Sequence, residues 1–409
     1  MNSNNTERPF DLIVFGASGF TGRLIAENLQ SGAGKDLKWA LGGRSLAKLS
    51  EVRALIGATD SLPLIAADAN DSASMAKLAG QTRVVISTVG PYQIHGKKLV
   101  LACAATGTDY VDLCGEPGWM QQMIPRLAAP ARASGARIVF SCGFDSIPFE
   151  LGVLFLQDES LRRFGKPLQR VRGRVRVMKG GMSGGTVASA LATFEQIGRN
   201  PALQRVLADP FALTPGFRGP EQPEGDSAAY DSQAGSWTGP FIMAPINTKN
   251  VHRSNALLGH PWGQNFEYDE RMLTGDGPRG EKRARAMARN ARIQNALLGF
   301  GPARALLRRF FLPKPGQGPS LQQREAGRYE ILFSGETADR QTLSASVCGD
   351  RDPGYGSTSK MIVQAAICLA KECSSAVTAG GVWTPGAAMG MTLVQRLQAH
   401  AGLRFEIGN

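Results

Sequence analysis

A short apolar run near the start of the chain leads directly into three closely spaced glycines. Leu12–Phe15 comes first, and an amphipathic segment follows the glycines. Glycine tolerates positive φ and lets a phosphate approach the main chain, while the unpaired N–H groups of a helix start attract the anion. The pattern predicts a strand, a tight turn and a helix that bind a dinucleotide. The residues expected to contact it are Gly16, Ser18, Gly19, Phe20, Thr21 and Gly22.

The residues after the second predicted strand bear on the choice of nucleotide. Leu37–Leu41 ends in two glycines, after which come Arg44, Ser45 and Lys48. An acidic residue here would bind the ribose hydroxyls of NAD, whereas a guanidinium can bracket a 2′-phosphate. We therefore expect NADP(H), held by these three residues; the alternative is a solvated arginine at a helix start. Asp68, at the end of the third predicted strand, is expected to meet the adenine or its ribose.

Two side chains that could move a proton follow the fourth predicted strand. Arg83–Val89 runs into a Gly-Pro turn, which places Tyr92 and His95 beyond the carboxyl edge of the sheet. Hydride transfer needs a donor for the oxygen on which charge develops. Tyr92 is the first candidate and His95 the second; alternatively, Tyr92 only packs against the nicotinamide and His95 caps the next helix. Further residues expected along the same crevice are Thr88, Gly90, Pro91, Cys142 and Gly143.

Some chemistries are disfavoured by what the chain lacks. None of its six tyrosines has a lysine four residues later, so the short-chain dehydrogenase mechanism is not expected. The six cysteines form no CxxC pair and no ligand spacing with the four histidines, which predicts reduced thiols and no metal site. Asp145 is expected to orient a backbone turn rather than to titrate.

The order of the predicted elements indicates the fold class. Strands alternate with helical stretches over residues 1–150, which predicts an α/β fold with a doubly wound parallel Rossmann sheet. Residues 151–375 are expected to form a second α/β domain with a mixed or antiparallel sheet, including a hairpin of Tyr329–Thr337 and Gln341–Cys348. Residues 214–263, dense in Pro and Gly, are expected to form long loops. We expect the helix and strand within residues 376–409 to pack back on the first domain.

The net charge of +12 is concentrated in two segments. Arginines alternate with apolar residues in Arg170–Val177, which predicts a strand with one cationic face that is either solvated or binds an anion. Residues 279–314 hold ten basic residues and one acid. Helices over Glu281–Leu298 and Ala303–Leu312 would suit a membrane interface or an acidic partner, or would pack on the sheet with snorkelling arginines.

Sequence features also bear on localisation and partners. No signal peptide opens the chain and no run approaches the length of a membrane span, so we expect a cytoplasmic protein with membrane association left open. Nucleic-acid binding is not expected, because zinc-finger spacing and aromatic–basic stacking motifs are missing. We expect a homodimer.

Seven motifs taken together resemble the saccharopine dehydrogenase-like oxidoreductases, and within them most closely the trans-acting enoyl reductase branch. The resemblance implies a Rossmann domain followed by a second α/β domain, and reduction by NADPH of a carbon–carbon double bond in a lipid or polyketide acyl chain, on a carrier or as a precursor. An amine-forming dehydrogenase and a non-catalytic NADP-binding scaffold at a membrane are the alternatives. The motifs are GASGFTG (16–22), STVGPYQIHG (87–96), GTDYVDLCGE (107–116), CGFDSIPFELG (142–152), GGMSGGTVAS (180–189), PKPGQGPS (313–320) and DPGYGSTSKM (352–361).

Overall fold

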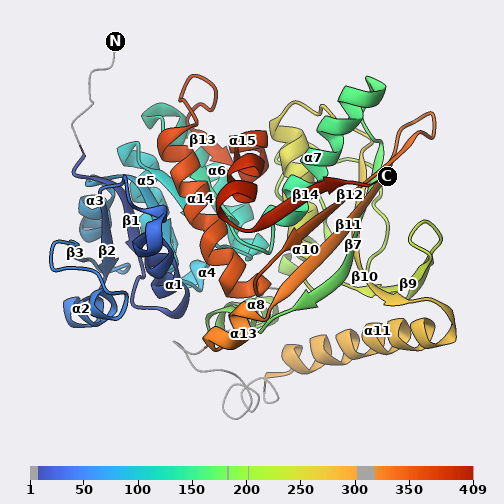
Figure 1. Ribbon diagram of the computed structural model, residues 1–409, viewed down its shortest axis with the longest axis horizontal. Coiled ribbons are helices and arrows are strands. Elements are labelled where there is room, and N and C mark those ends of the chain that lie inside the picture. The colour runs from blue at the N-terminus through green and yellow to red at the C-terminus, as the bar shows by residue number, and fades with distance from the viewer. Residues whose placement is uncertain (1–7, 182–183, 201, 302–317, 409) are drawn as a thin grey trace.

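Two seven-stranded sheets form the framework of the protein (Figure 1). The computed structural model describes residues 8–181, 184–200, 202–301 and 318–408. Sheet A lies in the N-terminal half, sheet B in the other half, and helices fill the space between them. No helix of the described segments is long and apolar enough to cross a bilayer.

Sheet A is the expected Rossmann sheet, and all its strand pairs are parallel. Its central strands read as apolar runs because helices bury both faces. Its order is β13 (Gly381–Trp383), β6 (Arg137–Val139), β5 (Asp109–Asp112), β4 (Thr82–Ser87), β1 (Phe10–Phe15), β2 (Trp39–Gly43) and β3 (Leu64–Ala66).

Helices cover sheet A on both faces. One face packs on α3, α5 and α6 around Ile13, Phe15 and Val85, and the other packs on α1 and α14 around Leu12 and Val14. The second core continues without a break into sheet B. The elements concerned are α1 (Phe20–Asn28), η1 (Leu29–Ala33), α2 (Leu46–Leu55), α3 (Ser72–Ala79), α4 (Tyr92–His95), α5 (Lys97–Thr106), α6 (Pro117–Ser134) and α14 (Thr358–Lys371).

Sheet B is mixed, since β7 and β10 are parallel while its other pairs are antiparallel. Its order is β14 (Leu403–Ile407), β12 (Thr342–Gly349), β11 (Arg328–Glu336), β7 (Arg170–Lys179), β10 (Glu267–Gly275), β9 (Ser236–Pro240) and β8 (Ala229–Asp231). The expected hairpin is β11 and β12. The remaining elements are α7 (Ile147–Phe164), α8 (Gly184–Arg199), α9 (Ala202–Ala208), α10 (Ala244–Leu257), α11 (Gly277–Gly299), α13 (Leu321–Glu325), η2 (Pro353–Ser357) and α15 (Pro385–His400).

The C-terminal segment divides between the two sheets. β13 joins the edge of sheet A beside β6, whereas β14 pairs with β12 at the edge of sheet B. α15 packs on α7 and α14 between them. The expectation that the last strand returns to the first domain is therefore wrong, because the hairpin strand β12 offers it a free edge.

The segment 214–263 is more regular than expected, because it contains β8, β9 and the 14-residue helix α10. Polar side chains on α10 are buried and bonded: the amide of Asn247 donates to Glu270 at 2.8 Å and that of Asn250 to Ser146 at 2.6 Å. The Ser254 hydroxyl donates to Glu150 at 2.6 Å. A helix that buries polar residues shows no apolar period, and this is why the sequence pattern misses it.

Candidate functional site

The glycine turn at the carboxyl end of β1 has the expected strand, turn and helix geometry. Gly16 has φ +89°, and a Cβ there would lie 2.6 Å from the Thr88 hydroxyl oxygen. A Cβ on Gly22 would lie 2.3 Å from the Gly16 carbonyl oxygen. The turn therefore approaches both β4 and α1 so closely that only glycine fits at these two positions. Thr88 reinforces it by donating to the carbonyls of Phe15 and Gly16, each at 3.2 Å.

Helix α1 begins immediately after this turn. Gly19 is its N-cap and supplies no side-chain cap, so the first N–H groups of the helix remain available to an anion. Ser18 and Gly19 are exposed beside it. The Phe20 ring has a different contact, because it packs edge-on against Tyr355 at 5.2 Å and lies under the Arg324 guanidinium. Phe20 therefore joins the two halves of the molecule through its side chain.

Two cations stand exposed beyond β2. Arg44 and Lys48 are exposed, and within the described ranges no acidic side chain pairs with either. The hydroxyl of Ser45 accepts from the Lys48 N–H at 3.3 Å and caps α2. This arrangement suits a 2′-phosphate, which needs cations and helix N–H groups. Asp68 has a local role as well, since its carboxylate accepts from the Asn70 N–H at 2.9 Å in the turn before α3.

The hydroxyl of Tyr92 is occupied by the fold. It donates to the Ser87 carbonyl at 3.1 Å and accepts from the Leu113 N–H at 3.1 Å, which joins the carboxyl ends of β4 and β5. The ring is 5% exposed and packs on Trp119. Burial also raises the pKa of Tyr92 well above its usual range. This geometry does not support Tyr92 as the proton donor; it positions the turn.

His95 ends the short helix α4 and is partly exposed. Glu116 holds the start of that helix, because its carboxylate accepts from the N–H groups of Tyr92 at 3.0 Å and Gln93 at 2.8 Å. Burial raises the pKa of Glu116. Glu116 is therefore a positioning residue that sequence reasoning missed; its signal was an acid following β5 in the motif GTDYVDLCGE.

The loop after β6 separates buried residues from one accessible acid. Cys142 and Gly143 are buried, and Gly143 is covered by Leu113 and Thr358. The expectation that both residues line the ligand site is therefore not supported. Asp145 is only partly buried, and in the described structure no hydrogen bond engages its carboxylate. Burial raises the pKa of Asp145 to about 6. The Asp145 carboxylate therefore does not orient the turn through a hydrogen bond.

Elements of the second half of the chain lie against the turns that follow β1 and β4. The Ser189 hydroxyl of α8 lies 3.6 Å from a Cβ built on Gly90, in the turn that continues through Pro91. Gly318 packs against the Phe20 ring, and Pro353 of η2 packs on Gly180. Ligands of parallel sheets bind beyond the carboxyl ends of the strands. Asp145 lies at that edge near Gly115, three strand positions from the glycine turn of β1, which is about 14 Å at the usual spacing.

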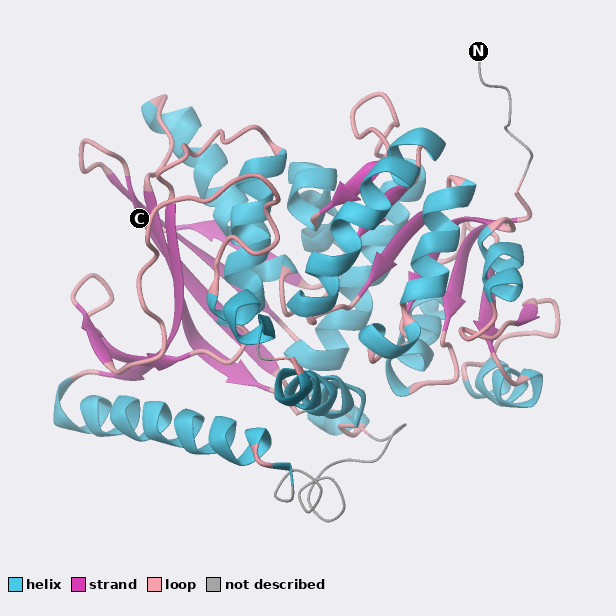
Figure 2. Cartoon of the chain, turned by 180° about the vertical axis from the view of Figure 1, so that it is seen from behind, coloured by secondary structure: helices cyan, strands magenta, loops and turns pink. Residues whose placement is uncertain are grey.

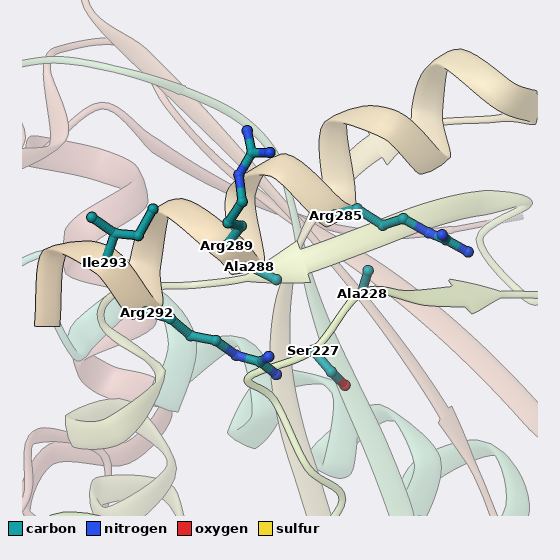
Figure 3. Close-up of a pocket in the computed structure, with 7 residues that line it drawn as sticks. All are labelled: Ser227, Ala228, Arg285, Ala288, Arg289, Arg292 and Ile293. Atoms are coloured by element: carbon teal, nitrogen blue, oxygen red, sulfur yellow. The ribbon is translucent and has the colours of Figure 1, made fainter. Parts of the chain in front are cut away.

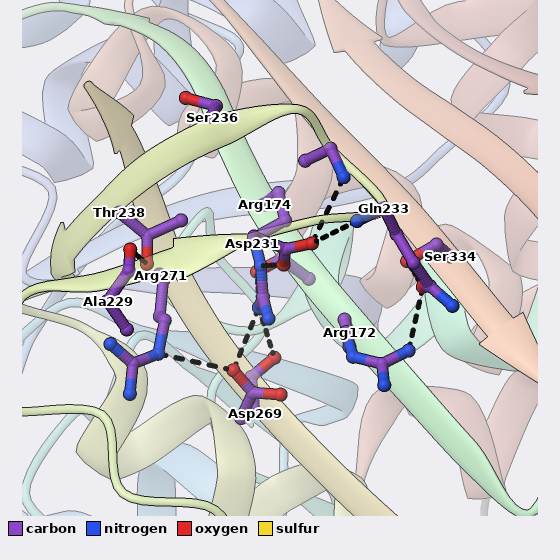
Figure 4. Close-up of polar contacts among 12 residues, drawn as sticks. Arg172, Arg174, Ala229, Asp231, Gln233, Ser236, Thr238, Asp269, Arg271 and Ser334 are labelled. Carbon is purple, nitrogen blue, oxygen red and sulfur yellow. Dashed lines mark hydrogen bonds and ion pairs between the residues drawn. The ribbon is translucent and has the colours of Figure 1, made fainter. Parts of the chain in front are cut away.

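The arginines on the predicted cationic face of β7 pair with acids on other strands of sheet B, and Figure 4 shows the pairs that Arg174 makes. Arg174 is buried and contacts Asp231 at 2.6 Å and Asp269 at 2.8 Å. The other three arginines on this face also reach acids: Arg170 with Glu267, Arg172 with Glu336 and Arg176 with Glu330. An anion-binding surface here is therefore not supported. In the described segments, no cluster of three or more His, Cys, Asp or Glu could hold a metal ion.

Comparison with known proteins agrees with a nucleotide-binding role for the first domain. The family model described as the saccharopine dehydrogenase NADP-binding domain matches residues 12–139. A Mycobacterium tuberculosis protein with the name "putative trans-acting enoyl reductase" is 39% identical over 417 residues, covering 98% of both chains.

Two further relatives carry related names. A trans-acting enoyl reductase of M. tuberculosis is 36% identical and one of Mycobacterium ulcerans is 34% identical; each match covers 96% of this chain, and 96% and 97% of the relatives. Among solved structures, the L-Glu-forming saccharopine dehydrogenase of Saccharomyces cerevisiae covers 98% of this chain and 100% of its own, with a TM-score of 0.53 at 13% identity. That likeness supports the fold, and the family model identifies NADP(H) as the cofactor.

Proposed function

Because the chain belongs to the trans-acting enoyl reductase family, whose NADP-binding domain is of the saccharopine dehydrogenase type, we propose that it reduces a carbon–carbon double bond of an acyl intermediate. The observation that carries the proposal is the glycine turn beside the exposed cations Arg44 and Lys48, with elements of the second half of the chain packed against it. NADPH, when bound, supplies the hydride.

The chain's own residues hold the cofactor and supply the proton. The N–H groups at the start of α1 would hold the pyrophosphate of NADPH, and Arg44 with Lys48 would hold its 2′-phosphate. After hydride addition, the resulting enolate requires a proton, either on the substrate carbon next to the carbonyl or on the enolate oxygen. Asp145 is the acid proposed for this step. Among the described acids in the loops after β4, β5 and β6, it is the one that is partly exposed and whose carboxyl makes no hydrogen bond.

The test is NADPH oxidation with substrates of two classes. An enoyl pantetheine thioester represents an acyl chain on a carrier, and an amino acid mixed with a keto acid represents the amine-forming reaction. We expect turnover with the thioester. Turnover only with the amino acid pair would replace the proposal with the saccharopine dehydrogenase reaction. Proven NADPH binding without turnover of either class would favour a non-catalytic role.

An enzyme that acts on acyl chains of a lipid pathway is expected to meet membranes. Helix α11 lies on the outside of sheet B (Figures 1 and 2). α11 packs on β9, β10 and α8, and its buried residues are the small Gly280, Ala284 and Ala288. Beyond Ala288 no residue of α11 is buried. Its second half therefore presents side chains to whatever lies outside the protein.

Cations and large apolar side chains lie on the exposed surface of α11, and Arg292 is at the edge of that surface beside a groove. Lys282, Arg289 and Arg292 are exposed, and no acid among the described residues pairs with them. Ile293, Leu297 and Phe300, spaced by four and three residues, are 51%, 46% and 63% exposed. A groove of about 330 Å³ lies beside Arg289 and Ile293, and Arg292 extends across it toward Ser227 (Figure 3). The expected second helix, Ala303–Leu312, lies outside the described residues.

We propose that this surface of α11 rests on an anionic membrane. Unpaired cations attract acidic headgroups, and exposed Ile, Leu and Phe side chains gain free energy by entering the interface.

Vesicle co-sedimentation tests this contact. We expect binding to vesicles that contain phosphatidylglycerol, little binding to phosphatidylcholine alone, and release by salt. Lys282→Glu with Arg289→Glu and Arg292→Glu should weaken binding at least ~100-fold, at about 1 kcal/mol per basic residue removed. The control, Lys77→Glu with Arg126→Glu and Arg132→Glu, changes the net charge equally on α3 and α6. Equal losses in both triple variants, or binding only to a soluble acidic protein, would refute the proposal.

A further inference from the structure

Two cysteine thiols meet at the carboxyl end of α14, far from the glycine turn in the fold. The sulfur atoms of Cys368 and Cys373 are 3.5 Å apart. Cys368 is buried on α14 and Cys373, just beyond the helix, is partly exposed. The spacing of five residues contains no known ligand or redox pattern, so sequence reasoning treated both as ordinary reduced thiols.

The backbone holds the two cysteines together independently of their sulfur atoms. The N–H groups of Glu372 and Cys373 both donate to the Cys368 carbonyl at 2.9 Å, which closes a tight turn at the helix end. Arg137 fixes this turn to sheet A by donating to the Cys373 carbonyl at 2.7 Å and to the Leu369 carbonyl at 2.8 Å. Arg137 is itself paired with Asp109 of β5. The thiols therefore meet in a preorganised setting rather than by fraying of the helix.

We infer that Cys368 and Cys373 form a redox-active dithiol that closes to an intramolecular disulfide by exchange with a low-molecular-weight disulfide. A disulfide needs its sulfur atoms about 2.05 Å apart, so the pair has to approach by about 1.5 Å. Rotation of the partly exposed Cys373 side chain can supply that movement. Two thiols without further ligands do not form a zinc site, which takes four.

Cys373 is the attacking group. The hydrogen bond from the Cys368 thiol lowers the pKa of Cys373, and the nearby Arg137 charge acts in the same direction. Burial contributes to raising the pKa of the other four cysteines, namely Cys103, Cys114, Cys142 and Cys348. Because the thiolate is the nucleophile in disulfide exchange, Cys373 should react before the others.

The exchange balances in two steps. The Cys373 thiolate attacks one sulfur of the small disulfide, forms a mixed disulfide and expels one thiolate. Cys368 then loses its proton to water and attacks the Cys373 sulfur, which expels the second thiolate. The protein gains one disulfide, and the small disulfide is reduced to two thiols.

Trypsin cleavage makes the product easy to identify. Lys371 lies between the two cysteines, so digestion separates residues 361–371 from residues 372–396 unless a disulfide joins them. The full-length protein is treated with oxidised glutathione, denatured, alkylated and digested without reductant, and the peptides are measured by mass spectrometry. We expect the joined pair as the main product, reversed by dithiothreitol.

Single variants distinguish the two roles. Cys368→Ser should stop at the mixed disulfide on Cys373, whereas Cys373→Ser should show neither product. Cys348→Ser, which removes the other partly exposed thiol, should behave as the unaltered protein. The inference fails if Cys348 is modified first, or if the unaltered protein accumulates as much mixed disulfide as Cys368→Ser. NADPH-dependent turnover is not measured, so this result stands apart from the proposed reaction.

Discussion

Arg44 is the residue expected to distinguish NADPH from NADH. Its side chain is exposed beyond β2 without an acidic partner among the described residues, and a charge-assisted contact with the 2′-phosphate is worth about 2 kcal/mol. Arg44→Ala should raise the KM for NADPH about 30-fold and leave that for NADH nearly unchanged. Arg126→Ala, an exposed arginine of α6, is the matched control. An unchanged KM for NADPH would mean that Arg44 is only a solvated arginine, and an equal rise for both nucleotides would mean that it does not act on the 2′-phosphate.

Asp145 should govern the fall in turnover that occurs as the pH rises. Burial raises the pKa of Asp145 to about 6, and a general acid must be protonated to act, so turnover should fall as the pH rises through that value. Asp145→Asn should lower kcat by about 100-fold and remove this limb of the pH profile, with the KM for NADPH preserved. A limb that persists in Asp145→Asn would assign the proton to another group, of which His95 is the next to test.

Arginines on the same face of β7 are expected to contribute differently to stability. Removing Arg174 would leave Asp231 without its close cation and Asp269 with only Arg271 at 3.6 Å, which costs about 3 to 5 kcal/mol of unfolding free energy. Arg176, on the same face, is paired at the surface with Glu330, and its loss should cost less than about 1 kcal/mol. Urea denaturation of Arg174→Ala and Arg176→Ala measures both. Similar losses would show that the face is merely solvated.

Elements were predictable from sequence wherever their own residues determine them. β1, β4 and β5 read as strands because both faces of sheet A are buried, and Thr384 with Pro385 marks the start of α15, where the Thr384 hydroxyl accepts from the Ala387 N–H at 3.4 Å. Failures came where a distant partner decides the role. Tyr92 bonds to main-chain atoms of two strands, and the β7 arginines meet acids brought by β8, β10 and β11.

The whole molecule carries buried carboxyl groups that join its helices, strands and loops to one another. Burial raises the pKa of Asp112 and of Glu150 to about 7 and that of Glu270 to about 8. Glu150 joins α7 to α10 and α15 through Ser254 and the Gly386 N–H, and its second oxygen has no hydrogen-bond partner in the described structure. A proton on that oxygen relieves the cost of burying a charge.

The direction of the pH dependence follows from these groups. Each binds its proton more tightly in the folded than in the unfolded chain, where a carboxyl titrates near 4, so their contribution to stability is full at low pH and is lost as the pH rises from about 4 to 8. The unfolding free energy should therefore fall between pH 5.5 and pH 8, by about 1 to 3 kcal/mol for each group.

Denaturant titration at those two pH values measures the slope, and two variants identify its source. Glu150→Gln and Glu270→Gln keep the shape of the side chain without the charge and should each flatten the slope. Asp339→Asn is the control, because its exposed carboxylate is held below its usual pKa by Lys166, to about 2, and it stays charged throughout this range. Two outcomes would contradict this account: a stability that rises toward pH 8, or glutamine variants that both keep the full slope. Either would mean that these carboxyls are charged in the folded protein. The helices around Glu150 would then be held by ionic rather than neutral hydrogen bonds.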